Sequence, residues 1–185
     1  MKYYQTDFLG YLPIEDHSVD LFISSVPLKI ISDECGLLFG ILNRYMTENG
    51  FILIDAPAGY THYDLSLWHG ASAALWTKYT HHFVKDFYKA GENQLISVYY
   101  KQGSRGHVCD NTSQFSVDPN REKSHPCEFC PTLIRTLIER YSVPDDTVLD
   151  GFCGTGTVPG EAEAMGRYGI GCDLRPYENI RSEYR

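Results

Sequence analysis

Acidic residues and glycines with chemically useful spacing gather near the end of the chain, in the segment TVLDGFCGTGTVPGEAEAMGRYGIGCDL over 147–174. The segment predicts a buried strand, a glycine-rich turn, a short helix and a second strand. Gly154 and Gly156 carry no Cβ, so the backbone can turn tightly there and approach a ligand closely. Asp173 ends the second strand 19 positions after Gly154, where a carboxylate can accept hydrogen bonds from a ribose diol. The order of elements therefore predicts a βαβ nucleotide-binding unit.

The first residue of the turn is an acid, Asp150, and the turn lacks the third glycine of a dinucleotide fingerprint. A carboxylate in this place would repel a pyrophosphate, but it suits a cationic ligand that carries an ammonium and a sulfonium group. S-adenosylmethionine is such a ligand, and we expect it as the cofactor. The alternative is a structural glycine turn inside an ordinary α/β domain.

Two segments of the chain resemble the amino-directed DNA methyltransferases, which methylate the exocyclic nitrogen of adenine or cytosine. They are QTDFLGYLPIEDHSVDLFISSVPL at 5–28 and HPCEFCPTLIRTLIERYSVPDDTVLDGFCGTGT at 125–157. In the branch of the family that the chain resembles, the catalytic motif precedes the cofactor loop, and the same permuted order occurs here. The resemblance implies a Rossmann-like fold with a circularly permuted motif order.

The resemblance also implies roles for residues around the cofactor. Asp7 matches the acid that receives the adenine amino group, Phe129 is expected near the methionine tail, and Phe152 is expected to line the same pocket. The alternatives are a surface carboxylate ahead of a turn for Asp7 and simple core packing for the two phenylalanines. The full set expected to bind cofactor is Asp7, Phe129, Asp150, Phe152, Cys153, Gly154, Gly156, Thr157 and Asp173.

The expected catalytic motif reads Ser25-Val26-Pro27-Leu28, where the family carries Asp, Asn or Ser, then Pro, Pro and an aromatic residue. An exocyclic amine becomes nucleophilic when a side-chain oxygen and the next backbone carbonyl accept its hydrogen bonds. Ser25 and the Val26 carbonyl can supply these acceptors, but Val26 does not fix φ as proline does, and Leu28 cannot stack on a base. Ser24 is the alternative acceptor if the strand is shifted by one residue, because neighbouring side chains on a strand face opposite ways.

Strands alternating with helices predict one α/β domain over residues 1–185, with a mostly parallel sheet and an antiparallel hairpin. We expect a catalytic half at 1–101, a loop at 102–124 in place of a recognition region, and a cofactor half at 125–185. Asp33 is expected to cap a helix that runs to Met46, with Asn49-Gly50 as its stop signal. The first and last strands should lie at the same edge of the sheet. The expected strands are 2–5, 19–24, 51–55, 82–88, 95–101, 147–149 and 168–172, and the expected helices are 33–46, 64–79 and 129–141.

Composition fits one folded domain of 185 residues with 43% hydrophobic residues, enough to bury about 70% of the unfolded surface. The absence of a long apolar run or a signal peptide predicts a cytoplasmic protein with no membrane span. Six scattered cysteines suit a reducing compartment.

Cys127 and Cys130 form one C-x-x-C pair near Cys109, His107 and His125, whereas zinc usually requires two such pairs. The sequence therefore predicts no metal.

Two classes of function follow from these observations. The first is an S-adenosylmethionine-dependent methyltransferase of DNA amino groups, of the kind found in restriction-modification systems, with a slow rate of methyl transfer. The second is a catalytically inactive cofactor-binding protein that serves as a partner subunit, and methylation of RNA or a small molecule stays open as a third. The net charge of −8 is unfavourable for binding DNA through bulk electrostatics. We therefore expect recognition of DNA to involve a local basic patch, a homodimer or a partner subunit.

Overall fold

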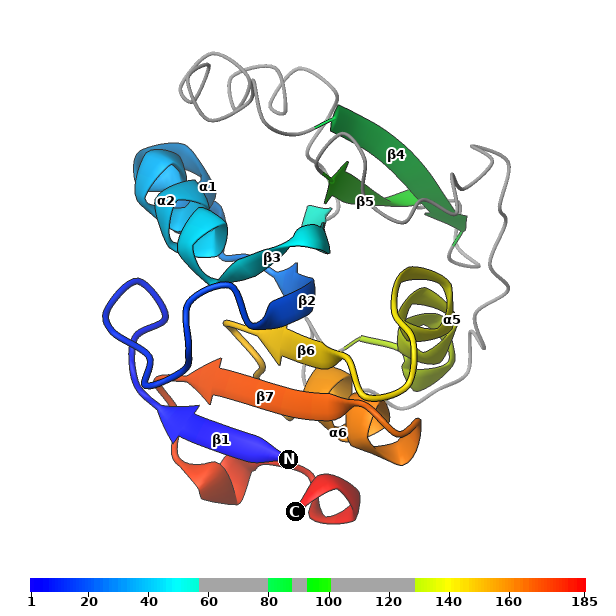
Figure 1. The fold of residues 1–185 in the computed structure, drawn as a ribbon. Helices are drawn as coiled ribbons and strands as arrows, with labels where there is room; N and C mark the ends of the chain where they lie inside the picture. The colour runs from blue at the N-terminus through cyan, green and yellow to red at the C-terminus, as the bar shows by residue number, and fades with distance from the viewer. Residues whose placement is uncertain (57–79, 88–92, 101–128) are drawn as a thin grey trace.

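The central feature is a seven-stranded sheet with the strand order β1-β7-β6-β2-β3-β5-β4 (Figure 1). The computed structural model describes residues 1–56, 80–87, 93–100 and 129–185. All neighbouring strands are parallel except β3–β5 and β5–β4, which confirms the predicted mostly parallel sheet with an antiparallel pair. The strands are β1 (Lys2–Gln5), β2 (Val19–Ser25), β3 (Met46–Ala56), β4 (Thr80–Phe87), β5 (Asn93–Tyr100), β6 (Thr147–Asp150) and β7 (Tyr168–Asp173).

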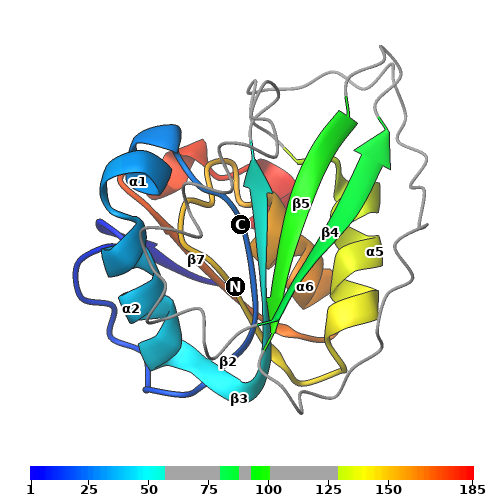
Figure 2. The same cartoon turned by 90° about the horizontal axis from the view of Figure 1, so that it is seen from above.

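Helices cover both faces of this sheet (Figures 1 and 2). On one face lie α1 (Leu28–Asp33) and α2 (Cys35–Tyr45), and on the other lie α5 (Pro131–Tyr141) and α6 (Thr157–Ala164). Two short 3-10 turns, η1 (Tyr177–Asn179) and η2 (Ser182–Tyr184), follow β7. The predicted helix over 64–79 lies outside the described residues.

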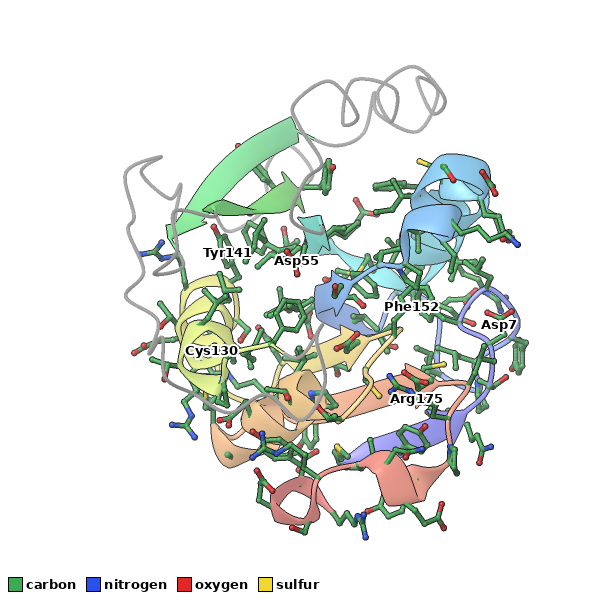
Figure 3. The ribbon with its side chains drawn as sticks, turned by 180° about the vertical axis from the view of Figure 1, so that it is seen from behind. Asp7, Asp55, Cys130, Tyr141, Phe152 and Arg175 are labelled. Atoms are coloured by element: carbon green, nitrogen blue, oxygen red, sulfur yellow. The ribbon has the colours of Figure 1, made fainter. Side chains whose placement is uncertain are left out.

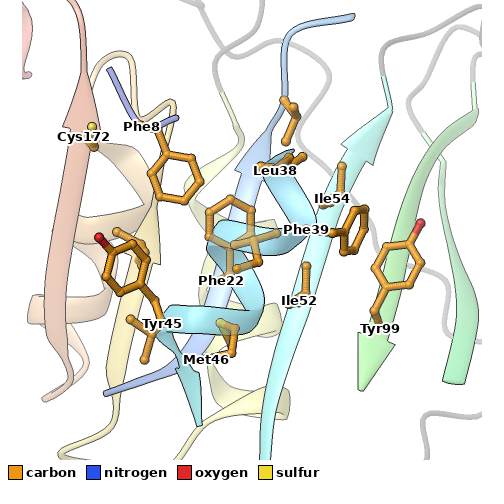
Figure 4. Close-up of a cluster of buried hydrophobic side chains, with 14 of the residues drawn as sticks. Phe8, Phe22, Leu38, Phe39, Tyr45, Met46, Ile52, Ile54, Tyr99 and Cys172 are labelled. Atoms are coloured by element: carbon orange, nitrogen blue, oxygen red, sulfur yellow. The ribbon is translucent and has the colours of Figure 1, made fainter. Parts of the chain in front are cut away.

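Alternation along the central strands produces two cores. Phe22 of β2 and Ile52 of β3 point toward α2, where they pack with Phe8, Phe39 and other apolar side chains (Figure 4). The neighbouring residues of the same strands, Leu21, Ile23, Phe51 and Leu53, point to the opposite face and pack against α5 and α6. Because successive side chains on a strand face opposite ways, the near-continuous apolar runs of β2 and β3 are what a sheet buried on both faces requires.

The predicted helix over 33–46 ends as expected, since α2 ends at Tyr45 with Met46 as its C-cap, but its predicted cap and stop signal are wrong. Asp33 is the last residue of α1, and its carboxylate accepts a hydrogen bond from the Ser32 hydroxyl at 2.6 Å. Helix α1 begins directly after Pro27, whose φ of −56° suits a helix start. The chain then bends at Glu34, with φ −128° and ψ 16°, before α2.

Asn49-Gly50 does not stop a helix either, because β3 already begins at Met46. Val19 pairs with Met46 and Leu21 with Phe51, so β3 carries extra residues in an irregular stretch that includes Gly50. A Cβ on Gly50 would lie 3.0 Å from the carbonyl oxygen of Asp20. The glycine thus permits a close approach of two strands rather than ending a helix.

Strand β1 at the edge of the sheet pairs in parallel with β7, and Lys2 lies opposite Ile170. The two ends of the chain lie on this side of the molecule (Figure 1), as the permuted motif order predicted. This pairing brings the loop after β1 beside the end of β7.

Gly169 of β7 lets α6 pack closely on the sheet. A Cβ on this residue would lie 2.1 Å from the backbone oxygen of Pro159. We expect Gly169→Ala to lower the free energy of unfolding by about 1–3 kcal/mol, because helix backbone cannot yield as a side chain can. Gly40→Ala is the control, since Gly40 lies in α2 with nothing near its Cβ position, and it should raise stability by about 0.5–1 kcal/mol. Urea unfolding of both variants measures the difference, and an unchanged Gly169→Ala protein would contradict the close packing of α6 on β7.

Candidate active site

A cavity of about 690 Å³ opens at the carboxyl ends of the parallel strands, the edge where open α/β sheets bind ligands. Its size lies within the usual range for small-molecule sites, about 300–1,000 Å³. Most of the residues singled out from the sequence line it: Asp7, Ser25, Val26, Pro27, Phe129, Asp150, Phe152, Cys153, Gly154, Thr157 and Asp173. Figure 3 shows Asp7, Phe152 and Arg175 at this end of the sheet, although they come from three separate segments.

Asp173 is held in place at the end of β7 by the chain itself. Its Oδ2 accepts a hydrogen bond from the backbone N–H of Gly154 at 2.8 Å, and its Oδ1 accepts one from the backbone N–H of Arg175 at 2.9 Å. The Arg175 guanidinium adds a contact to Oδ1 at 3.2 Å. Partial burial acts to raise the pKa of Asp173, but these donors outweigh it and hold the pKa below its usual range. Asp173 is therefore an ionised acceptor fixed between the glycine loop and β7.

Asp150 is buried at the end of β6, with 2% of its surface exposed. Its Oδ1 accepts hydrogen bonds from the Ser24 hydroxyl at 2.6 Å and from the backbone N–H of Phe152 at 3.1 Å. Burial raises the pKa of Asp150 to about 7, although the two hydrogen bonds act in the opposite direction. Its carboxylate is thus bonded within the protein, and it reaches the cavity from the wall rather than projecting into it.

This raised pKa predicts a pH-dependent stability in the absence of ligand. The native state holds the Asp150 proton up to about pH 7, whereas the unfolded chain releases it near the ordinary aspartate pKa of 3.8. The free energy of unfolding should therefore fall as the pH rises from about 4 to 7, by on the order of 4 kcal/mol from this group. Asp150→Asn cannot ionise, and its stability relative to wild type should rise over the same window.

Urea unfolding at pH 4.5 to 8 measures this difference. Asp16→Asn is the control, because Asp16 is exposed and pairs with Arg44 at the surface. Parallel stability curves for Asp150→Asn and wild type would contradict a buried, titrating Asp150.

The glycine loop owes its shape to left-handed backbone at two positions. Gly154 has φ +55° and Gly156 has φ +82°, conformations that side chains with a Cβ rarely adopt. Gly154 lines the cavity, whereas Gly156 starts α6 and faces Ile180, which would lie 3.0 Å from an added Cβ. The backbone N–H of Arg181 donates to the Thr155 carbonyl at 3.0 Å. The segment after β7 therefore supports the loop from behind.

Aromatic rings form the apolar walls of the cavity. Phe8 follows Asp7 directly and contacts Phe152 edge-on, with ring centroids 5.5 Å apart. Phe129 lies just before α5 and is buried at 6% exposure. Asp7 is exposed, and its Oδ1 accepts a hydrogen bond from the Leu9 N–H at 3.0 Å. A carboxylate beside these rings suits a flat ligand with amino groups at its edge.

The expected catalytic strand places Ser24 and Ser25 on opposite faces. Ser25 lines the cavity together with Val26 and Pro27, while the Ser24 hydroxyl is directed to Asp150. Leu28 is the first residue of α1. On the neighbouring strand, Asp55 pairs in register with Ser25 and is buried. Of the two serines, Ser25 is the one on the cavity side.

The family model for DNA methylases that act at N6 and N4 matches residues 75–180, more than half of the chain. The chain belongs to this DNA methylase family. Within that segment lie the glycine loop and Asp173, whereas Asp7 and Ser25–Leu28 precede it. The family match thus covers the cofactor half and leaves the expected catalytic motif outside.

A curated relative of the chain is the type II methyltransferase M1.MboII of Moraxella bovis, 35% identical over 77 residues. The match covers 37% of this chain, and the chain spans 30% of the length of that relative. Among solved structures, PvuII DNA methyltransferase, which is cytosine-N4-specific, has a TM-score of 0.77 at 16% identity, covering 94% of this chain and 82% of that one. The structure of M1.HpyAVI in complex with SAM has a TM-score of 0.62 at 17% identity. This match covers 90% of this chain and 84% of that one. At these identities the two structures establish the fold.

Several residues that line the cavity were not singled out from the sequence, among them Phe8, Glu34 and Arg175. Phe8 and Arg175 flank acids that were identified, so their position next to Asp7 and two residues after Asp173 was an available signal. Glu34 gave no such signal, because its place at the cavity depends on the break between α1 and α2.

Of the residues weighed for a zinc site, Cys130 is buried at the start of α5, and Cys127, Cys109, His107 and His125 lie outside the described residues. Within the described ranges, no group of three or more His, Cys, Asp or Glu side chains could hold a metal ion. The helices in the same ranges are too short or too polar to cross a membrane.

Proposed function

We propose that this DNA methylase transfers a methyl group from S-adenosylmethionine to the exocyclic amino group of adenine or cytosine in DNA. The observation that carries the proposal is a single cavity lined by two sets of residues. Asp7, Asp150 and Asp173 lie on the side expected to bind cofactor, and Ser25 and Val26 lie on the side expected to face the base.

The charge of the cavity supports a cationic cofactor. Among the described lining residues, four are acids and one, Arg175, is a base. We assign Asp173 as the acceptor for the ribose diol, Asp7 as the acceptor for the adenine amino group, and Asp150 as the carboxylate that faces the ammonium and sulfonium groups. SAM complexes are known for a protein of the same fold, M1.HpyAVI, which agrees with this assignment.

The bound cofactor would supply an electrophilic methyl group, and the chain would prepare the attacking amine. The Ser25 hydroxyl oxygen and the Val26 carbonyl accept hydrogen bonds from the two amino hydrogens, which makes the nitrogen lone pair more available. Phe8 and Phe152 exclude water from one wall of the cavity. These tasks need acceptors in fixed positions, which the end of β2 provides.

The departures in the motif reduce the expected rate. Without an aromatic residue at position 28, the base loses a stacking contact worth about 1–3 kcal/mol, which corresponds to about a 5- to 150-fold slower reaction. This departure favours a second candidate function, a partner protein that binds the cofactor and has lost the chemistry. The two functions share the cofactor site and differ in the chemistry at Ser25–Leu28.

We further propose that the chain acts as a single methyltransferase domain, with 1–101 as the catalytic half and 125–185 as the cofactor half. Residues 102–124 are too few for a recognition domain. Because the net charge is −8 and DNA affinity comes largely from contacts to phosphates, recognition is assigned to a second copy or a partner subunit.

Incubation with methyl-labelled S-adenosylmethionine and mixed-sequence DNA, followed by nucleoside analysis, tests the proposal. N6-methyladenine or N4-methylcytosine supports the enzyme and identifies the target base. Cofactor binding in calorimetry without any transfer to DNA or RNA would instead support the partner protein.

A further inference from the structure

A buried hydrogen bond joins the catalytic strand to the cofactor loop. The Ser24 hydroxyl at the end of β2 donates to Asp150 Oδ1 at the end of β6, at 2.6 Å. The two residues are 126 positions apart in the chain and are exposed by 0% and 2%. Since β2 and β6 are neighbouring parallel strands, the contact connects the two halves of the site directly.

The groups around Asp150 make the hydrogen bond from Ser24 important for the ionisation of its carboxyl group. Among the described residues, the titratable groups that interact with Asp150 are Asp173, Cys153 and Cys172. Burial raises the pKa of both thiols, that of Cys172 to about 12, so both stay neutral near pH 7. Asp173 is ionised, and its repulsion disfavours charge on Asp150.

Among the described residues that line the cavity, the one cationic side chain is Arg175, and its guanidinium is engaged by Asp173 Oδ1. The charged form of Asp150 is favoured by hydrogen bonds from the Ser24 hydroxyl and the Phe152 N–H. An alanine substitution leaves the Phe152 backbone N–H in place, whereas it removes the Ser24 hydroxyl.

We propose that Ser24 is a positioning residue for the cofactor: its hydroxyl orients the Asp150 carboxyl group and favours its charged form opposite the ammonium group of S-adenosylmethionine. This inference rests on the cofactor assigned under the proposed function. Ser24 is fully buried, so it acts through Asp150. The two adjacent serines thereby have different roles. Ser24 acts on the cofactor side through Asp150, and Ser25 accepts a hydrogen bond from the target base.

Calorimetry of S-adenosylmethionine binding from pH 6.5 to 9 tests the role of Ser24. A hydrogen bond to a charged group is worth about tenfold or more in an equilibrium constant, so Ser24→Ala should bind about five- to tenfold more weakly at pH 6.5 to 7. The deficit should shrink to about twofold at pH 9, where Asp150 ionises without help. The ratio of wild type to variant cancels the titration of the ligand's own amino group, and Ser24→Thr, which keeps the hydroxyl, should restore binding.

Ser142→Ala is the matched control, because Ser142 is another buried serine with a bonded hydroxyl, and it should leave the affinity ratio flat with pH. A deficit in Ser24→Ala that is equal at every pH would reduce Ser24 to a packing role and overturn the proposal.

A carbon NMR titration of the Asp150 carboxyl in ligand-free protein separates this inference from the proposed function. Ser24→Ala should move the midpoint upward by about one pH unit or more, and an unchanged midpoint overturns the role of Ser24. Wild-type protein that binds no S-adenosylmethionine at any pH would instead reject the cofactor assignment, whatever the titration shows.

Discussion

Asp173→Ala is expected to lower the affinity for S-adenosylmethionine by about 100-fold or more. The side chain is an ionised acceptor at the cavity wall, and truncation leaves two ribose hydroxyls without their partner. Each unsatisfied buried group costs about 1–3 kcal/mol, and each 1.4 kcal/mol is about a tenfold change in affinity. The substitution also removes the acceptor for the Gly154 N–H, so the glycine loop loses a support in the same step.

Calorimetry with S-adenosylmethionine and its demethylated product measures the loss. Asp16→Ala is the control, because this carboxylate is half exposed and pairs with Arg44 away from the cavity. Equal affinities of wild type and Asp173→Ala would show that the ribose is held elsewhere.

Ser25→Ala is expected to lower methyl transfer by about 100-fold or to the limit of detection, while the dissociation constant for the cofactor changes by less than about twofold. The reason is that a fixed hydrogen-bonding group at a reacting centre typically contributes 10²–10³ in rate, and Ser25 lies on the side assigned to the base. The measurement pairs single-turnover transfer with calorimetry of the same protein.

Ser18→Ala is the control for this variant, since the Ser18 hydroxyl is exposed and donates to the Glu15 carbonyl. Leu28→Tyr should raise the rate of methyl transfer, because it restores an aromatic ring on which the base can stack. If Ser25→Ala methylates DNA as fast as wild type, Ser25 has no part in the reaction.

The sheet and most of the site could be predicted because they depend on local patterns. The apolar runs of β2 and β3 indicate strands wherever they lie in the fold. The spacing between the Gly154–Gly156 turn and Asp173 indicates a nucleotide-binding unit in the same way. The edge position of β1 followed from the permuted order of the motifs. These features need only periodicity and sequence order.

The features that were missed depend on contacts between distant segments. The sequence indicates an acid at position 150 but not its bond to Ser24, which joins residues from the two halves of the chain. The break at Glu34 arises because α1 starts immediately after Pro27, so Asp33 ends a helix instead of capping one. Propensity favours a cap at an aspartate, but tertiary position decides which helix it belongs to.

The pairing of β1 with β7 has a consequence for how the protein folds. Lys2 and Ile170 meet across 168 positions of chain, and contacts between residues so far apart form slowly because a long loop must close first. Asp7 reaches the cavity only when this edge strand has docked. The pocket for the adenine end should therefore be the last part of the site to assemble and the first to open. Hydrogen exchange at Tyr3 and Tyr4 should be faster than at β6, and a ligand that bridges Asp7 and Asp173 should slow it.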